Sequence, residues 1–135
     1  MTARTERMNT LTLWHDIVTT GAADRLDEVL AEDCVFYSPV VHTPQRGRAL
    51  SRLYLTGAMQ VFNDSFHYTR EVVDGDQLVL EFECTVEGIL INGVDIITLN
   101  AEGLISEFKV MVRPLKAVNL LHERMRAMLE QLGGR

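Results

Sequence analysis

One carboxylic acid, Asp95, stands in a stretch of apolar residues where a charged group is costly to place. The segment reads VDIITL over residues 94–99, and its alternation predicts a strand with Asp95, Ile97 and Leu99 on one face. If this face points into the protein, burial disfavours the carboxylate and raises its pKa. Asp95 is then a candidate catalytic acid or base. The alternative is a buried Asp that hydrogen bonds satisfy, or one that lies at the rim of the sheet.

A second group of candidates would form the walls of an apolar ligand pocket. Trp14 is the only tryptophan, and it serves as a core anchor, as a pocket wall whose indole N–H points to a ligand, or as both. The other expected ligand-binding residues are Phe36, Ser38, Tyr54, Phe62, Phe82, Phe108, Val110 and Val112. Because an enclosed pocket and an ordinary core use the same residue types, the sequence leaves both interpretations open.

The four histidines are too scattered to predict a metal site. His15 follows Trp14 in a predicted helix, where it either reaches the pocket edge or stays partly exposed. His42 is a candidate for the pocket entrance, whereas His67 and His122 are expected at the surface or at an interface. None shows ligand spacing such as H-x-x-x-H beside acids, so we expect neither a metal nor another cofactor.

Length, charge and cysteine usage limit the class of protein. A chain of 135 residues favours one domain, which we place at residues 10–132 after a lead-in over residues 1–9. The net charge of −6 argues against nucleic-acid binding, and the lack of a run of roughly 18 apolar residues argues against a membrane span. Cys34 and Cys84 lie in apolar runs, which predicts buried, reduced thiols and a cytoplasmic location.

Apolar periodicity predicts the elements that position the candidate residues. Spacings of three and four predict helices over residues 11–18, 24–31, 49–62 and 115–132. Strand formers and alternation predict strands over residues 34–38, 65–73, 78–86, 94–99 and 104–112. Asn92-Gly93 predicts a tight turn, and Gly133-Gly134 the end of the last helix. Helices followed by a run of strands favour an α+β fold with an antiparallel sheet.

Three stretches of the chain resemble a known family. They are residues 21–39, where Ala31-Glu32-Asp33 leads into a strand, then Gly47-Arg48-Ala49-Leu50 at a helix start, and residues 94–103, which end in Asn100-Ala101-Glu102-Gly103. In order and spacing, residues 10–114 resemble the nuclear transport factor two-like superfamily, which includes ketosteroid isomerases and SnoaL-like polyketide cyclases. The resemblance implies a cystatin-like fold, in which a cone-shaped, curved antiparallel sheet is wrapped by N-terminal helices around an apolar pocket. It also implies dimers through the outer sheet face.

Ketosteroid isomerases use three catalytic groups, and the resemblance carries only one of them over unchanged. In those enzymes an Asp at the end of the first strand moves the proton, while a Tyr and a protonated strand Asp stabilise the oxyanion. Matched by position, Asp95 corresponds to the strand Asp. Trp14 stands in place of the Tyr, and Ser38 stands in place of the proton-moving Asp. A serine is no general base without an activating partner, so steroid isomerisation by that mechanism is not expected.

Two functions stay open at this point. The first is a cofactor-free enzyme that moves a proton on a small, largely apolar carbonyl or ring compound, as an isomerase, cyclase, dehydratase or hydrolase. Asp95 would be its acid, base or hydrogen-bond donor, and Trp14 and Tyr54 would position the substrate. The second is a non-catalytic module that binds a ligand or mainly dimerises.

The outer face of the sheet and the C-terminal helix predict how the domain is covered. Lys109, Met111 and Arg113 share the outer face of the last strand, next to Val94 and Ile96, and form a partly apolar surface. We expect this surface to pair two copies in a homodimer. The C-terminal helix is an addition to the isomerase plan, and its apolar stripe must cover the pocket mouth, the sheet edge or a partner subunit. We expect it to cover its own domain.

Overall fold

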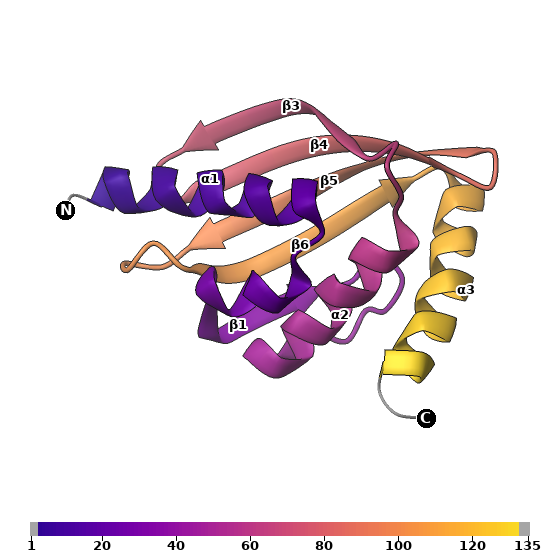
Figure 1. The fold of residues 1–135 in the computed structure, drawn as a ribbon, viewed down its shortest axis with the longest axis horizontal. Coiled ribbons are helices and arrows are strands. Elements are labelled where there is room, and N and C mark those ends of the chain that lie inside the picture. Colours follow the sequence, from indigo (N-terminus) through magenta and orange to yellow (C-terminus); the bar gives the residue numbers. More distant parts are fainter. Residues whose placement is uncertain (1–2, 133–135) are drawn as a thin grey trace.

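One six-stranded sheet organises the structure, a computed structural model that describes residues 3–132. The helices are α1 (Ala3–Thr20), the 3-10 helix η1 (Ala23–Glu28), α2 (Arg48–Val61) and α3 (Leu115–Leu132). The strands are β1 (Leu30–Tyr37), β2 (Gln45–Arg46), β3 (His67–Asp74), β4 (Gln77–Val86), β5 (Ile89–Leu99) and β6 (Ile105–Arg113). They lie in the order β2-β1-β6-β5-β4-β3 (Figure 1).

The sheet is curved and mixed. Strands β3 to β6 follow one another as antiparallel neighbours, whereas β1 runs parallel to β6. A parallel pair needs a long crossover, and here the chain between β1 and β6 contains α2 and the strands β2 to β5. The α+β fold with a curved sheet and N-terminal helices is therefore confirmed, but the sheet is not antiparallel at this pair.

The helices enclose one face of the sheet. In Figure 1, α1 lies across the central strands, α2 runs beside β1, and α3 stands at the end of the sheet. Helix α3 packs against α2 and also contacts β5 and β6, so the C-terminal helix covers its own domain as expected. Among the helices over residues 3–132, none is both long enough and apolar enough to cross a membrane.

The predicted helix over residues 24–31 is shorter than expected. The structure has the 3-10 helix η1 there, and Leu30 and Ala31 already belong to β1. Leu30 pairs with Ile105 of β6, and both Leu30 and Ala31 are buried. Leu26, Val29 and Leu30 have the i, i+3, i+4 spacing of a helix face, so the apolar pattern alone does not show that a strand begins at Leu30. The described end of α3 is Leu132, so the predicted stop at Gly133-Gly134 lies outside the described residues.

The predicted turn at Asn92-Gly93 is wrong, because β5 runs through both residues without a break. Gly93 pairs with Phe82 on β4, and a Cβ atom added at Gly93 would overlap the Phe82 ring. The glycine therefore makes room for the aromatic ring of Phe82, which approaches the backbone of the strand closely. The turn between β4 and β5 is instead at Glu87 and Gly88, which have φ angles of 52° and 77°.

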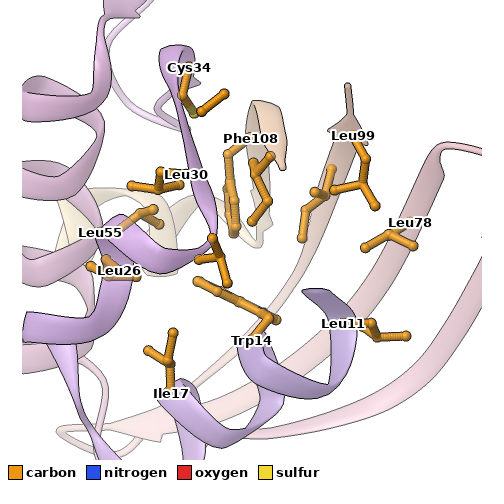
Figure 2. Packing of buried hydrophobic residues seen from close by; sticks show 14 of the residues in the cluster. Leu11, Trp14, Ile17, Leu26, Leu30, Cys34, Leu55, Leu78, Leu99 and Phe108 are labelled. Carbon is orange, nitrogen blue, oxygen red and sulfur yellow. The ribbon is translucent and has the colours of Figure 1, made fainter. Parts of the chain in front are cut away.

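The core has two parts. The first lies between α1, η1, β1 and the sheet, where Trp14 packs on Phe108 with a ring distance of 5.1 Å (Figure 2). The second lies between β4, β5 and α3 and is built around Phe82. The alternation predicted for residues 78–86 is confirmed, since every second side chain of β4 from Leu78 to Val86 is buried. Replacing a buried ring such as Phe108 by Ala would cost about 3–5 kcal/mol.

Candidate functional site

A cavity of about 510 Å³ lies between the inner face of the sheet and the helices. This volume is in the range of roughly 300–1,000 Å³ that small-molecule sites occupy. Seven aromatic rings stand in its walls, and they come from α1, β1, the segment after α2, β3, β4 and β6. The rings that line it belong to Trp14, Phe36, Phe62, Phe66, Tyr68, Phe82 and Phe108. Aromatic walls of this kind favour a flat, apolar ligand.

Asp95 is the buried carboxyl of this cavity. It stands on the inner face of β5, where only 5% of the residue is exposed. Its Oδ2 accepts a hydrogen bond of 2.7 Å from the Tyr68 hydroxyl. Burial raises the pKa of Asp95 to about 7, although the hydrogen bond from Tyr68 lowers it. At neutral pH the carboxyl therefore exists in both protonation states, which suits a group that gives and takes protons.

Tyr68 connects Asp95 to Trp14. The indole Nε1–H of Trp14 donates a 3.0 Å hydrogen bond to the Tyr68 hydroxyl oxygen, and the hydroxyl in turn donates to Asp95. Burial, followed by the neighbouring Asp95 charge, raises the pKa of Tyr68 well above its ordinary value. Tyr68 therefore stays a neutral donor. The result is a chain of three groups, from α1 through β3 to β5, that ends on the carboxyl.

A β-bulge turns two side chains of β3 into the cavity. Tyr68 pairs with Phe82 and Glu71 pairs with Leu80, while Thr69 is the extra residue between them. Residues directly opposite each other on neighbouring strands share a face, and Phe82 and Leu80 are both buried. Tyr68 and Glu71 thus point to the same side although they are three residues apart. Both line the cavity.

His15 of α1 meets Glu71 at the edge of the cavity. His15 Nε2 lies 2.7 Å from Glu71 Oε2, and the two side chains are 34% and 36% exposed. The His15 ring also contacts the Tyr68 ring edge-on, at 5.4 Å between centroids. Of the two alternatives for His15, the structure supports both at once, since this half-buried helix residue also lines the cavity.

The sheet with a buried Asp, the enclosing helices and the aromatic cavity agree with one family of domains. The family model for the SnoaL-like domain matches residues 11–108. The chain belongs to this family. No curated protein matches it in sequence.

Solved structures of SnoaL-like and related proteins resemble the chain over most of its length. A steroid delta-isomerase from Pseudomonas aeruginosa is 32% identical with a TM-score of 0.91, and 96% of each chain is covered. A protein with a cystatin-like fold from Silicibacter pomeroyi DSS-3 is 36% identical with a TM-score of 0.82, covering 87% of this chain and 83% of that one. A SnoaL-like polyketide cyclase from Jannaschia sp. CCS1 is 17% identical with a TM-score of 0.69, over 85% and 90% of the chains, and shares the fold alone.

Most of the residues predicted for the site of this SnoaL-like domain line the cavity. They are Trp14, Phe36, Ser38, Phe62, Phe82, Asp95, Phe108 and Val110. Tyr54 and Val112 do not line it. The Tyr54 ring packs on Phe36 at 5.5 Å, in the first part of the core, and Val112 packs against the second part. Tyr54 is therefore placed to support a wall of the cavity and not to touch a ligand.

Ser38 and the histidines bear out the sequence interpretation only partly. Ser38 Oγ accepts a 3.1 Å hydrogen bond from the Val40 backbone N–H, and no activating base contacts this hydroxyl in the described part of the chain. His67, expected at the surface, is exposed but also lines the cavity, whereas His42 does not line it. Within residues 3–132, no group of three or more His, Cys, Asp or Glu side chains is arranged to hold a metal ion.

Tyr68 and Glu71 are functional candidates that sequence reasoning missed. Strict alternation places residues 68 and 71 on opposite faces of a strand, and only the bulge at Thr69 brings them together. The edge strand β3 also shows little alternation, because most of its residues are exposed. The one available signal was the aromatic spacing of Phe66 and Tyr68. Helix α3 adds Leu121 and Met125 to the cavity wall.

Proposed function

We propose that this SnoaL-like protein binds a small, largely apolar ligand in the cavity and moves a proton on it through Asp95, without a cofactor. One observation carries the proposal. A carboxyl with a pKa of about 7 faces an aromatic cavity of about 510 Å³ and has a tyrosine hydroxyl as its hydrogen-bond partner. Keeping such a group buried is costly for the fold, and perturbed acids in cavities are typical of active sites.

The reaction class follows from what Asp95 and Tyr68 offer. Protonated Asp95 gives a hydrogen bond or a proton to a carbonyl or ring oxygen, and the carboxylate takes a proton from an acidic O–H or C–H. Tyr68 stabilises the carboxylate that remains after proton donation. Isomerases, cyclases, dehydratases and hydrolases all use such a step. The resemblance to a steroid delta-isomerase supports an enzyme of this general type.

A non-catalytic ligand-binding module is the second candidate function. It is favoured by Ser38, which stands where ketosteroid isomerases carry the proton-moving Asp and whose oxygen already accepts a bond from Val40 N–H. In that case Asp95 and Tyr68 recognise a ligand oxygen by hydrogen bonding, and no turnover follows.

Ligand binding is tested with 4-nitrophenol, a flat apolar molecule with one ionisable oxygen. Trp14 is the only tryptophan and lines the cavity, so its fluorescence reports binding directly. The variants are Asp95→Asn and, as a matched control, Asp74→Asn at the exposed end of β3. We expect saturable quenching that Asp95→Asn weakens by about 10- to 100-fold, as expected for a hydrogen bond to a charged group, and that Asp74→Asn leaves unchanged. Equal affinity of all three proteins would overturn the proposal.

A further inference from the structure

The pair formed by His15 and Glu71 is the second titratable unit of the cavity, and nothing in the role of Asp95 uses it. The 2.7 Å contact between His15 Nε2 and Glu71 Oε2 joins α1 to β3 beside Tyr68. With Nε2 directed at Glu71, the other ring nitrogen, Nδ1, has no hydrogen-bond partner among the described residues. This is the arrangement in which a carboxylate orients a histidine so that its second nitrogen is free to accept a proton.

We propose that His15, oriented by Glu71, is the general base of this cavity and that Asp95 is the matching acid. The inference rests on the proposed function and assigns the two proton-transfer roles within it. His15 is the catalytic group, while Glu71 is a positioning residue that fixes the imidazole tautomer and stabilises the imidazolium that forms.

Tyr68 places the two groups at the same ligand. Its ring contacts the His15 ring at 5.4 Å, and its hydroxyl lies 2.7 Å from Asp95 Oδ2. All three residues line the one cavity of about 510 Å³. A flat molecule that lies along Tyr68 therefore meets His15 at the cavity edge and Asp95 further inside.

The substrate class is an uncharged, flat carbon acid with an oxygen a few bonds away from its acidic C–H. His15 Nδ1 takes the proton, the electron pair of the broken C–H bond moves through the molecule to the oxygen, and Asp95 donates to that oxygen. In an isomerisation the proton returns from His15 to another carbon, and Asp95 recovers its own proton. The step needs no oxidant, reductant or further reactant.

The competing interpretation is an ion pair that only holds α1 against β3. A half-exposed pair of this kind stabilises a protein little. The chain offers a matched control on the same helix, since Asp16 lies next to His15 and pairs with Arg25 at 2.7 Å, and neither residue lines the cavity. Asp16→Asn removes an ion pair of α1 without touching the proposed base.

The pH dependence of turnover separates the two interpretations. The titratable groups that line the cavity with His15 are Asp64, His67, Tyr68, Glu71 and Asp95. Turnover by the pair requires protonated Asp95 as the acid, so its rate falls as the pH rises through the Asp95 pKa of about 7. Without His15 the acid–base pair is broken, and when the Asp95 carboxylate takes over as the base the rate rises through its pKa of about 7 without falling.

The probe is 5-nitrobenzisoxazole. Loss of its C–H proton breaks the N–O bond, forms a nitrile and leaves the electron pair on oxygen as a coloured phenolate. We measure kcat, KM and the pH profile for the wild type, His15→Gln, Glu71→Gln, Asp95→Asn and the control Asp16→Asn, and 4-nitrophenol affinity for each. We expect His15→Gln to lose at least about tenfold in kcat, to keep KM and affinity within about threefold, and to lose the falling limb of the profile. Glu71→Gln loses less kcat, and Asp16→Asn behaves as the wild type.

The outcomes distinguish failure of the His15 assignment from failure of the Asp95 assignment. If His15→Gln keeps its kcat and the falling limb of its pH profile while Asp95→Asn loses activity, His15 is not the base and the role of Asp95 stands. If Asp95→Asn is fully active while His15→Gln is not, the role of Asp95 is overturned. A wild type that does not turn over the probe would overturn both assignments. Equal losses in His15→Gln and Asp16→Asn would show that the pair only holds the helix.

Discussion

Replacing Asp95 by Asn should make the protein more stable, and increasingly so as the pH rises. Asn has nearly the same shape, and its side-chain oxygen still accepts the hydrogen bond from Tyr68. What the substitution removes is the need to bury a carboxylate. Many active-site acids are kept at such a cost to folding, because the perturbed group is what the function requires.

The sign and the size of this stability difference follow from the pKa of Asp95. The pKa of Asp95 rises from its ordinary value of 3.8 to about 7 in the folded protein, so the folded state holds the Asp95 proton more tightly than the unfolded state. Below pH 3.8 the group is protonated in both states and contributes nothing. As the pH rises toward 7, Asp95 ionises first in the unfolded state, which stabilises that state. Once Asp95 is ionised in both states, the free energy of unfolding is lower by about 4 kcal/mol. Between pH 5 and pH 8.5 the loss grows by about 3 kcal/mol.

Urea unfolding followed by Trp14 fluorescence measures this effect. We compare the wild type, Asp95→Asn and the exposed control Asp74→Asn at pH 5 and pH 8.5. Effects of the amide itself and of all other titrating groups cancel in the difference between the two pH values. We expect the stability advantage of Asp95→Asn to increase by about 3 kcal/mol at the higher pH, and Asp74→Asn to follow the wild type. Parallel pH dependence of the wild type and Asp95→Asn would refute the reasoning.

Three further predictions concern the neighbours of Asp95 and the outer face. Tyr68→Phe removes the hydrogen bond that lowers the pKa of Asp95, so the Asp95 carboxyl should titrate at a higher pH. ¹³C NMR of the carboxyl measures this midpoint, and an unchanged midpoint would contradict the contact. Gly93→Ala places a methyl group into the Phe82 ring and should cost about 1–3 kcal/mol in urea unfolding, so a neutral result would contradict the packing. We propose that the outer face of the sheet pairs two copies in a homodimer. Met111 is 51% exposed on this face, beside Val79 and Val94, so replacing it by Glu would place a charge in the interface. Sedimentation should then show a dimer for the wild type and a monomer for Met111→Glu. A monomeric wild type at micromolar concentration would end that proposal.

The parts of the fold that were predictable are those with a clear period. Helix α3 was placed at residues 115–132 from its apolar stripe, and β4 from its alternation, because one buried face imposes a period on the sequence. Asp95 was found for the same reason, since a lone acid on the apolar face of a strand is conspicuous.

The parts that were missed depend on contacts between distant segments. Gly93 is a glycine because of the Phe82 ring on the next strand, so a local interpretation of Asn92-Gly93 took it for a turn. The extra residue at Thr69 is visible only from the register of β3 against β4, and it decides that Tyr68 and Glu71 face the cavity. The parallel pairing of β1 with β6 likewise joins segments that are separated by about half of the chain.

The most direct test of the account is the titration of Asp95 itself, with ¹³C-labelled aspartate and Asp95→Asn to assign the resonance. We predict a carboxyl midpoint of about 7, and a displaced midpoint when 4-nitrophenol is bound. A midpoint close to the ordinary 3.8, unaffected by the ligand, would contradict the claim that this cavity holds a proton-transfer group.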